Sequence, residues 1–290
     1  MTLTAPLRLP RAVLRTAGAW PFFAYTGLFL LLPTALVVVG ALTGPDGGAS
    51  LDGIRAALTP RTAQVFWTSV WLSAVTAAVG AVLGAVIAYA LSTAPDGSVT
   101  RRVVTAFVSV LAQFGGVMLA FAFVAVLGAN GLVTRLLREQ LDVVVSPGLL
   151  SSMTGLVLVY CYFQVPLMVV VFLPAVDGLR PQWREATTTM GGTTAQYWRR
   201  VAGPLLAPSF LGSFLLLFAN AFSAFATAAA LISQQTVIVP MAIESAIRNE
   251  NNTGMDSYAQ ALALGMIAVV GVVMTLHAWL QRRSSRWAAA

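Results

Sequence analysis

The sequence predicts an all-α membrane protein with six transmembrane helices. Of its 290 residues, 58% are hydrophobic and only 9% are charged, whereas a soluble domain carries roughly a quarter charged residues. Windows without any charged residue recur along the chain, and each is long enough for the roughly 20 helical residues that cross a bilayer core. The two observations indicate that most of the chain contacts lipid.

Six such windows define the expected spans. The first follows three arginines, as a signal peptide would, but its charge-free run is long enough for an uncleaved span. The stretch from Ser233 to Pro240 is too polar and too broken to add another helix. The expected spans cover about residues 18–42, 66–91, 103–128, 151–175, 207–232 and 257–280. Six spans place the two tails, residues 1–17 and 281–290, on the same side.

The arginines predict that this side is the cytoplasm. All seventeen basic residues are arginine, and cytoplasmic termini put twelve of them inside, as the positive-inside rule requires. The inside group is Arg8, Arg11, Arg15, Arg101, Arg102, Arg180, Arg184, Arg199, Arg200, Arg282, Arg283 and Arg286, and the outside group is Arg55, Arg61, Arg135, Arg138 and Arg248. The net charge of +7 therefore belongs to the membrane surface, and no nucleic-acid partner is expected.

Two outer loops have distinct patterns. Residues 131–141 alternate leucine and valine with Arg135, Arg138 and Glu139 at helical spacing, which predicts a short helix in the membrane interface. Residues 233–257 are polar and mixed in charge. They suit either a surface for an extracytoplasmic partner or an ordinary loop.

Several kinds of chemistry are excluded or disfavoured by composition. Without lysine, the chain cannot supply the lysine of a P-loop ATPase. The single cysteine, Cys161, cannot form an internal disulfide, and the single histidine, His277, cannot build a multi-histidine metal site. Paired carboxylates are absent from the spans, so we expect no catalytic residue, no metal site and no enzyme activity. The expected spans contain no charged residue. Transporters driven by an ion gradient usually keep charged residues within their spans, so an ion gradient is also disfavoured as the energy source.

One polar segment interrupts the apolar pattern, and it reads REATTTMGGTTAQYWRRVAGPLLAPS from residue 184 to 209. Its four charged residues would cost on the order of 12 kcal/mol at the bilayer centre, so it lies outside the membrane. Pro181 suits a first helical turn, and Gly191-Gly192 can provide a left-handed turn. Thr193 or Thr194 can then cap a second helix.

The segment is therefore predicted to form a pair of short helices that ends at Pro204 and Pro208. This pair would expose Tyr197 and Trp198. Such a pair suits docking to another protein. Packing against this chain's own loops is about equally compatible with the pattern.

The same segment resembles the EAA signature of the integral membrane subunits of ABC importers. Glu185, Ala186, Gly191 and Pro204 match that signature, and Val201 replaces an isoleucine. Thr187, Gly192 and Gly203 depart from it, since they stand for alanine, alanine and leucine. Residues 113–123 and 162–186 resemble the polyamine-type branch, which is itself similar to iron and thiamine importer subunits.

The resemblance implies a type I (MetI-like) permease of the bacterial plasma membrane, with residues 176–206 as a cytoplasmic coupling loop. It implies two ABC ATPase subunits, a second permease and an extracytoplasmic solute-binding protein as partners. ATP and magnesium would be used by the ATPases, and this chain would bind no cofactor. The coupling residues would be Glu185, Ala186, Thr187, Gly191, Gly192, Tyr197, Trp198, Val201 and Pro204.

Polar residues within the spans are candidates for the path of the solute. They are Gln113, Tyr160, Tyr162, Gln164, Asn220, Ser223 and Thr227. Each could equally hydrogen-bond one helix to another. The small residues from Ala219 to Leu231 favour close helix contacts and a place in a dimer interface.

The expected function is ATP-driven import of a small polar solute, with a spermidine- or putrescine-like cation as the first analogy. Iron, thiamine, phosphonate, sulfate or a sugar is the alternative cargo. A channel or gradient-driven transporter is the alternative of a different class, although it leaves the EAA-like segment unexplained.

Overall fold

The computed structural model describes residues 20–43, 48–95, 97–142, 146, 148–232, 238–248 and 255–288. The N-terminal tail with its three arginines falls outside these residues. The chain forms two compact units. The first combines residues 1–59 with 246–264, and the second combines residues 60–245 with 265–290.

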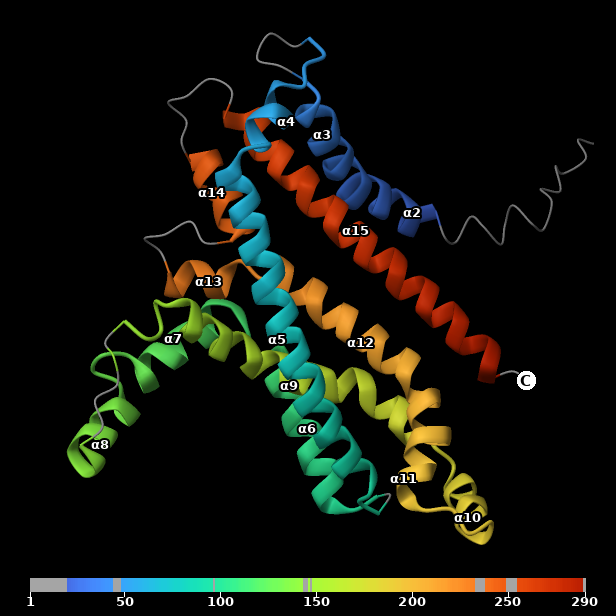
Figure 1. Cartoon of the computed structure of the whole chain (residues 1–290). Helices are drawn as coiled ribbons and strands as arrows, with labels where there is room; N and C mark the ends of the chain where they lie inside the picture. Colours follow the sequence, from blue (N-terminus) through green and yellow to red (C-terminus); the bar gives the residue numbers. More distant parts are fainter. Residues whose placement is uncertain are drawn as a thin grey trace, which may run out of the picture. The chain divides into compact units, whose positions relative to one another are not determined.

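The described residues form helices joined by short connections, which confirms the all-α prediction (Figure 1). In chain order they are α2 (Trp20–Thr26), the π-helix η1 (Gly27–Leu31), α3 (Leu32–Ala41), α4 (Asp52–Ala57), α5 (Pro60–Ser92), α6 (Val99–Gln113), α7 (Gly116–Leu127), α8 (Leu132–Leu141), α9 (Met153–Asp177), α10 (Pro181–Thr189), α11 (Thr194–Tyr197), the π-helix η2 (Trp198–Ala202), α12 (Gly203–Ser223), α13 (Ala226–Leu231), α14 (Val239–Arg248) and α15 (Met255–Ala288).

The first unit consists of α2 to α4 and the beginning of α15. Its large apolar side chains point outward; Trp20, Leu31 and Leu36 are all more than half exposed. In a membrane protein such a surface contacts lipid or a neighbouring helix. The hydroxyl of Ser257 donates a hydrogen bond of 3.1 Å to the Thr43 carbonyl and ties α15 to the end of α3.

The second unit is built around α5 and α9, which pack against each other over most of their lengths. Glycines make this approach possible. A Cβ at Gly80 would lie 2.6 Å from the Gln164 Cβ, and one at Gly84 would lie 2.4 Å from the Met168 Cβ. Small residues at four-residue spacing let transmembrane helices come close together. Helix α12 packs on both α5 and α9, and α6 packs on α9, which completes the core.

Six helices are long and apolar enough to span a membrane, in agreement with the predicted number. They run over Trp20–Ala41, Pro60–Ser92, Gly116–Leu141, Met153–Asp177, Thr194–Ser223 and Ser257–Gln281. The first and fourth agree with the expected bounds within about two residues at each end. The second is longer than expected, because α5 continues without a break from Pro60.

The third expected span, residues 103–128, differs from the structure. It contains two helices, since α6 ends at Gln113 and α7 begins at Gly116. Gly116 has a φ of +68°, a left-handed conformation that glycine adopts without the cost of a Cβ. This stretch contains no charged residue, so the absence of charge alone did not reveal the break.

The fifth expected span, residues 207–232, is also divided. Helix α12 ends at Ser223, and α13 begins at Ala226 after the extended Ala224. Beyond it, the stretch expected to be a polar loop contains α14, which is anchored where the Ser69 hydroxyl accepts a 2.9 Å bond from the Val239 N–H. Residues 233–237 lie outside the described part. The short helix expected at 131–141 is present as α8.

Candidate functional site: the EAA-like segment and a polar helix junction

The EAA-like segment, residues 181–204, folds as a helix, a tight turn and a second helix. Helix α10 begins at Pro181, as predicted. Gly191 takes a φ of +75°, which confirms the left-handed turn expected at the Gly-Gly pair. The N–H of Gly191 donates to the Thr188 carbonyl at 2.9 Å, and the N–H of Gly192 donates to the Thr187 carbonyl at 2.8 Å. The end of α10 is thereby closed by its own backbone.

The second helix begins with a capping box. The Thr193 hydroxyl accepts a 3.3 Å bond from the Gln196 N–H, and the Gln196 side chain accepts a 2.8 Å bond from the Thr193 N–H. This reciprocal pair satisfies two donors that a helix start leaves open. Of the two threonines proposed from sequence, Thr193 is the cap.

Two departures from the EAA signature, Thr187 and Gly192, lie against each other. The Thr187 hydroxyl donates to the Trp183 carbonyl at 2.8 Å, so the added polar group has a partner. A Cβ at Gly192 would lie 2.7 Å from the Thr187 Cγ2 and 2.8 Å from its carbonyl oxygen. The larger residue at one position therefore accompanies the smaller residue at the other.

The outer surface of α10 remains exposed. Glu185, Ala186 and Gly191 are exposed, and Met190 at the turn is 81% exposed. The Thr188 and Thr189 hydroxyls bond to carbonyls one turn earlier, at 2.7 and 3.0 Å. The segment thus presents a carboxylate and an apolar methionine on a surface whose hydroxyl groups are already bonded within the helix.

Tyr197 and Trp198 differ from the expectation that they are exposed. Tyr197 is only 7% exposed, and the Trp198 ring packs edge-on against Tyr89 of α5, with 5.0 Å between the ring centroids. Two aromatic rings at such a distance attract each other beyond their area burial. These side chains therefore join the EAA-like segment to the helices of this chain.

A π-helix follows Trp198 and explains the third departure from the signature. In η2 the N–H of Gly203 bonds to the Trp198 carbonyl, five residues earlier. A Cβ at Gly203 would lie 2.5 Å from that carbonyl oxygen, so the leucine of the signature does not fit here without a shift. Val201 lies half-buried within η2, and Pro204 is exposed in the first turn of α12. Single π-turns of this kind often occur at functional sites.

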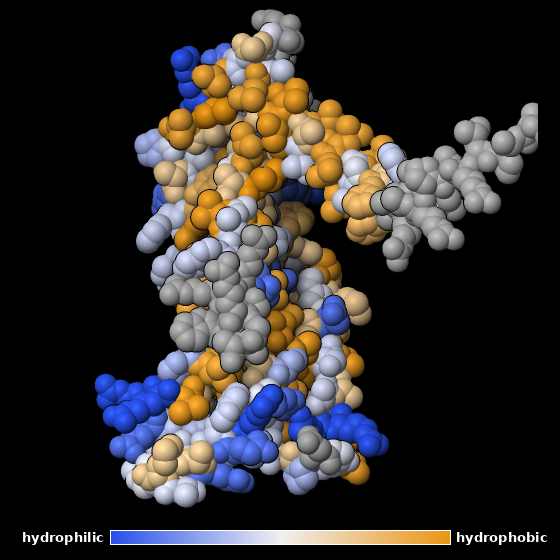
Figure 2. Space-filling view, turned by 90° about the vertical axis from the view of Figure 1, so that its right-hand side faces the viewer, coloured by the Kyte–Doolittle hydropathy of each residue, from blue (hydrophilic) through white to orange (hydrophobic). Residues whose placement is uncertain are grey.

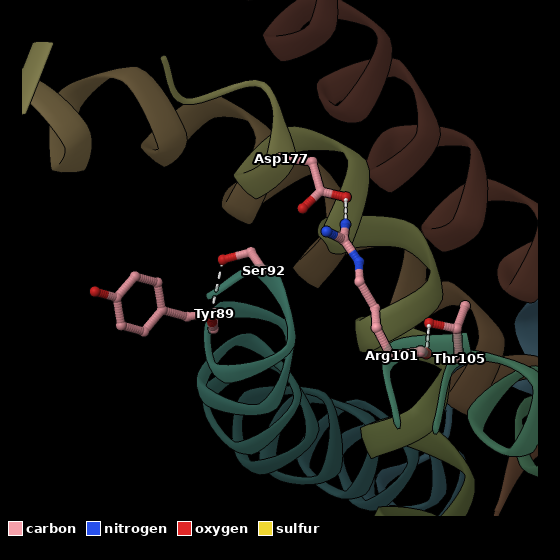
Figure 3. Close-up of polar contacts among 5 residues, drawn as sticks. All are labelled: Tyr89, Ser92, Arg101, Thr105 and Asp177. Atoms are coloured by element: carbon pink, nitrogen blue, oxygen red, sulfur yellow. Dashed lines mark hydrogen bonds and ion pairs between the residues drawn. The ribbon is translucent and has the colours of Figure 1, made fainter. Parts of the chain in front are cut away.

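An ion pair at the same end of the second unit was not predicted. Arg101 at the start of α6 reaches Asp177, the last residue of α9, with 2.5 Å between Nη2 and Oδ2 (Figure 3). Asp177 lies four residues before α10 begins, so the pair fixes the end of α9 beside the EAA-like segment. Its sequence signal was weak, because the two residues lie 76 positions apart.

The two divided spans meet at a polar junction. The Tyr160 hydroxyl of α9 donates to the Ala224 carbonyl in the break before α13, and the Thr227 hydroxyl donates to the Gly116 carbonyl at 3.2 Å. Helices α7 and α13 pack side by side, as Figure 1 also shows. Two of the predicted pathway residues, Tyr160 and Thr227, thus meet at these breaks. Their partners, the backbone carbonyls of Gly116 and Ala224, were not predicted.

The remaining pathway candidates divide by exposure. Gln164 is completely buried between α5, α9 and α12, and its Nε2 donates to the Leu217 carbonyl at 2.8 Å. Its Oε1 has no partner among the described residues. Gln113, Asn220 and Ser223 are exposed at the ends of α6 and α12. Tyr160, Gln164 and Thr227 therefore hydrogen-bond one helix to another. The exposed Gln113, Asn220 and Ser223 are accessible to a partner or a solute.

Comparison with known proteins identifies the family. The family described as "Binding-protein-dependent transport system inner membrane component" matches residues 80–286. This chain belongs to that family. The match covers the EAA-like segment and the divided spans, and with the six apolar helices it makes the chain a multi-pass protein of the bacterial inner membrane. As a member, it is an ABC importer permease with a MetI-like fold.

Its similar proteins include permeases for different solutes. The chain is 26% identical to the sulfate transport system permease protein CysW of Synechococcus elongatus, over 90% of this chain and 87% of that one. It is 21% identical to the spermidine/putrescine transport system permease protein PotB of Haemophilus influenzae, over 88% and 90%.

Solved structures show the same fold. A bacterial alginate ABC transporter, crystallised with an alginate-bound periplasmic protein, contains a chain that aligns with a TM-score of 0.71 and 14% identity, over 95% of this chain and 98% of that one. The inward-facing MetNI methionine ABC transporter aligns with a TM-score of 0.52 and 13% identity, over 78% and 99%.

Proposed function

We propose that the EAA-like segment is the cytoplasmic coupling element of this permease and that it docks on a separate ABC ATPase. The exposed Glu185 and Met190 and the locally closed turn at Gly191 support this role. The distribution of the arginines supports cytoplasmic termini and a cytoplasmic segment. The observation that carries the proposal is the agreement between the EAA-like residues and this helix–turn–helix geometry.

Motion of the segment reaches the membrane helices through one ring contact, and an ion pair nearby ties two of those helices together. The Trp198–Tyr89 ring contact joins it to α5, and the Arg101–Asp177 pair joins α6 to the end of α9. Coupling between distant sites travels through such packed side chains and rigid helices. A displacement of α10 and α11 would therefore move the ends of α5 and α9 together.

The solute would pass beside the polar junction as the spans change their tilt. The exposed Gln113, Asn220 and Ser223 would line the path, while Tyr160 and Thr227 would hold the divided helices in place. A second permease would supply the opposite wall, and the small residues from Ala219 onward suit a close contact with it.

The transported solute is small and polar, and a polyamine-like cation is our first candidate because of the similarity to PotB. Sulfate is the second candidate because of the similarity to CysW. An extracytoplasmic binding protein would deliver the solute, and the two partner ATPases would bind ATP and magnesium. Uptake of labelled spermidine and of labelled sulfate, measured in cells that depend on this permease, distinguishes the two candidates.

Charge reversal at Glu185 tests the coupling role. We expect Glu185→Lys to abolish ATP-driven uptake in vesicles with the complete transporter, while the chain still inserts and the ATPases still hydrolyse ATP. Glu139→Lys on α8 is the matched control and should retain uptake. Unchanged uptake in Glu185→Lys would contradict the proposal, and uptake by vesicles with this chain alone would favour a gradient-driven transporter instead.

A further inference from the structure

Two adjoining cavities lie beside the EAA-like segment in the second unit. The first has a volume of about 430 Å³ and lies between α5, α9, η2 and α12. The second has a volume of about 580 Å³ and lies between the ends of α5 and α9, the start of α6, and α10 and α11. Tyr89, Val176 and Trp198 line both, so the cavities share a wall.

The first cavity is lined almost entirely by apolar side chains. It lies along the membrane-spanning parts of α5, α9 and α12, and its lining includes Val86, Phe172 and Phe210. Val86 is 62% exposed, so the cavity opens on a surface that the bilayer covers. A hydrocarbon chain is the occupant that a site of this composition and position accepts without leaving a polar group unpaired.

The second cavity is basic. Its lining includes three arginines, Arg101, Arg180 and Arg184, and two carboxylates, Asp177 and Glu185. The Arg101–Asp177 ion pair forms one wall, beside Tyr89 and Ser92 at the end of α5 (Figure 3). Arg180 lies over the Trp183 ring at 6.0 Å. Within the described residues, the guanidinium groups of Arg180 and Arg184 form no hydrogen bond and no ion pair.

The charge balance of the second cavity favours an anion. Arg101 and Asp177 neutralise each other, which leaves two guanidinium groups against the single carboxylate of Glu185. Arginine binds phosphate oxygens with two parallel hydrogen bonds, and basic pockets between transmembrane helices bind the head groups of anionic lipids. Figure 2 shows hydrophilic residues gathered at the lower end of the second unit, the end at which α10 lies in Figure 1.

The geometry points to a binding site for one anionic phospholipid, with its phosphate between Arg180 and Arg184 and an acyl chain in the apolar cavity. A soluble phosphate would use only the basic cavity, and a neutral lipid would use only the apolar one. The lipid would contact α5, α9 and both helices of the EAA-like segment at once. This site rests on contacts within the chain and does not depend on the solute or on the proposed docking to an ATPase.

Native mass spectrometry of the purified full chain in detergent tests the site with phosphatidylglycerol. The double variant Arg180→Gln/Arg184→Gln should bind it about tenfold more weakly, because each removed arginine loses its attraction to the anionic head group. The matched control Arg199→Gln/Arg200→Gln removes the same charge from exposed residues that line neither cavity. This control should bind phosphatidylglycerol with almost the same affinity as the unchanged chain. An equal loss in both variants would overturn the proposal, because it would show unspecific attraction.

A second pair of variants tests the acyl chain site, even if the arginine variants fold poorly. Val86→Phe places a ring in the apolar cavity and should weaken phosphatidylglycerol binding several-fold. Val82→Phe, one turn earlier on the same exposed face of α5, should have no effect. Equal binding of phosphatidylcholine, full displacement of the lipid by inorganic phosphate, or unchanged binding in Val86→Phe would each contradict the assignment.

Discussion

The EAA-like segment and the polar junction both contain a break between helices, and they close it in different ways. The turn at Gly191 is closed by bonds between residues a few positions apart. The junction is closed by bonds across 64 and 111 positions, from Tyr160 to Ala224 and from Thr227 to Gly116. A segment closed by local hydrogen bonds keeps its conformation when a partner exerts force on it. A junction closed across spans responds when those spans move relative to each other.

In the proposed mechanism, the EAA-like segment and the polar junction have complementary roles. The segment receives force as a small rigid body, since its bonds do not depend on the membrane helices. The junction converts movement of α9 into movement of the ends of α7 and α13, because its bonds join all three. Substitutions in the EAA-like segment should therefore reduce the coupling of ATP hydrolysis to uptake. Substitutions at the polar junction should reduce the stability of the fold.

After the charge reversal at Glu185, the largest expected effect is at the turn of the EAA-like segment. Gly191→Val should lower ATP-driven uptake by more than about tenfold, because a left-handed conformation costs an L-residue 1–2 kcal/mol and a β-branched residue more. Gly191→Asn is the control, since asparagine adopts this conformation more readily. Uptake assays in vesicles with the complete transporter measure both, and equal uptake would show that the turn is not required.

The next largest effect is at the polar junction. Tyr160→Phe removes the donor to the Ala224 carbonyl and should lower the free energy of unfolding by about 1–3 kcal/mol. Tyr162→Phe is the matched control, because Tyr162 packs edge-on against Phe123, a contact that the substitution preserves. It should change stability by less than about 0.5 kcal/mol. Unfolding in mixed micelles measures both, and similar losses would argue against a specific bond.

A smaller effect tests the pair of departures from the EAA signature. Gly192→Ala should cost about 1 kcal/mol, at the low end for overpacking, because its Cβ would press on Thr187 in an exposed segment. Adding Thr187→Ser removes the opposing methyl group and should restore part of the loss. The contact with the Thr187 carbonyl would persist, so full recovery is not expected. Thermal unfolding of the two variants gives the comparison, and no recovery would show that the side chains do not interact.

The smallest effect concerns the ion pair beside the segment. Arg101 and Asp177 are partly exposed, at 18% and 35% of their side chains, so solvent weakens their attraction. A double-mutant cycle with Arg101→Gln and Asp177→Asn should give a coupling energy below about 1 kcal/mol. A much larger value would show that solvent does not weaken the pair and that it is a strong link between α6 and α9.

Local signals in the sequence predicted the start, the turn and the cap of the EAA-like segment. The expected end of its second helix at Pro204 and Pro208 was wrong, because the helix continues through η2 and both prolines into α12. Pro181, Gly191 and Thr193 each act on their own backbone, so their positions in the sequence determine the local structure. The number of spans was predictable for a similar reason, since length and composition decide which segments can cross a bilayer. The bounds of the third and fifth spans were not predicted.

Long-range packing decided what the sequence did not reveal. The breaks at Gly116 and Ala224 lie in stretches without charged residues, and they form where α7 and α13 pack together. Tyr197 and Trp198 look like exposed docking residues until the end of α5 is placed beside them. Arg101 and Asp177 become partners only through the packing of α6 on α9.

Site-specific photocrosslinking tests the central claim most directly, with a crosslinker at position 185 in α10 and a control at position 138 in α8. In the assembled transporter, we predict that position 185 forms an adduct with the ATPase, that it does so more efficiently when ATP is bound, and that position 138 forms none. If position 185 instead reacts with reagents confined to the outside of the cell, or never crosslinks to an ATPase, the account is contradicted.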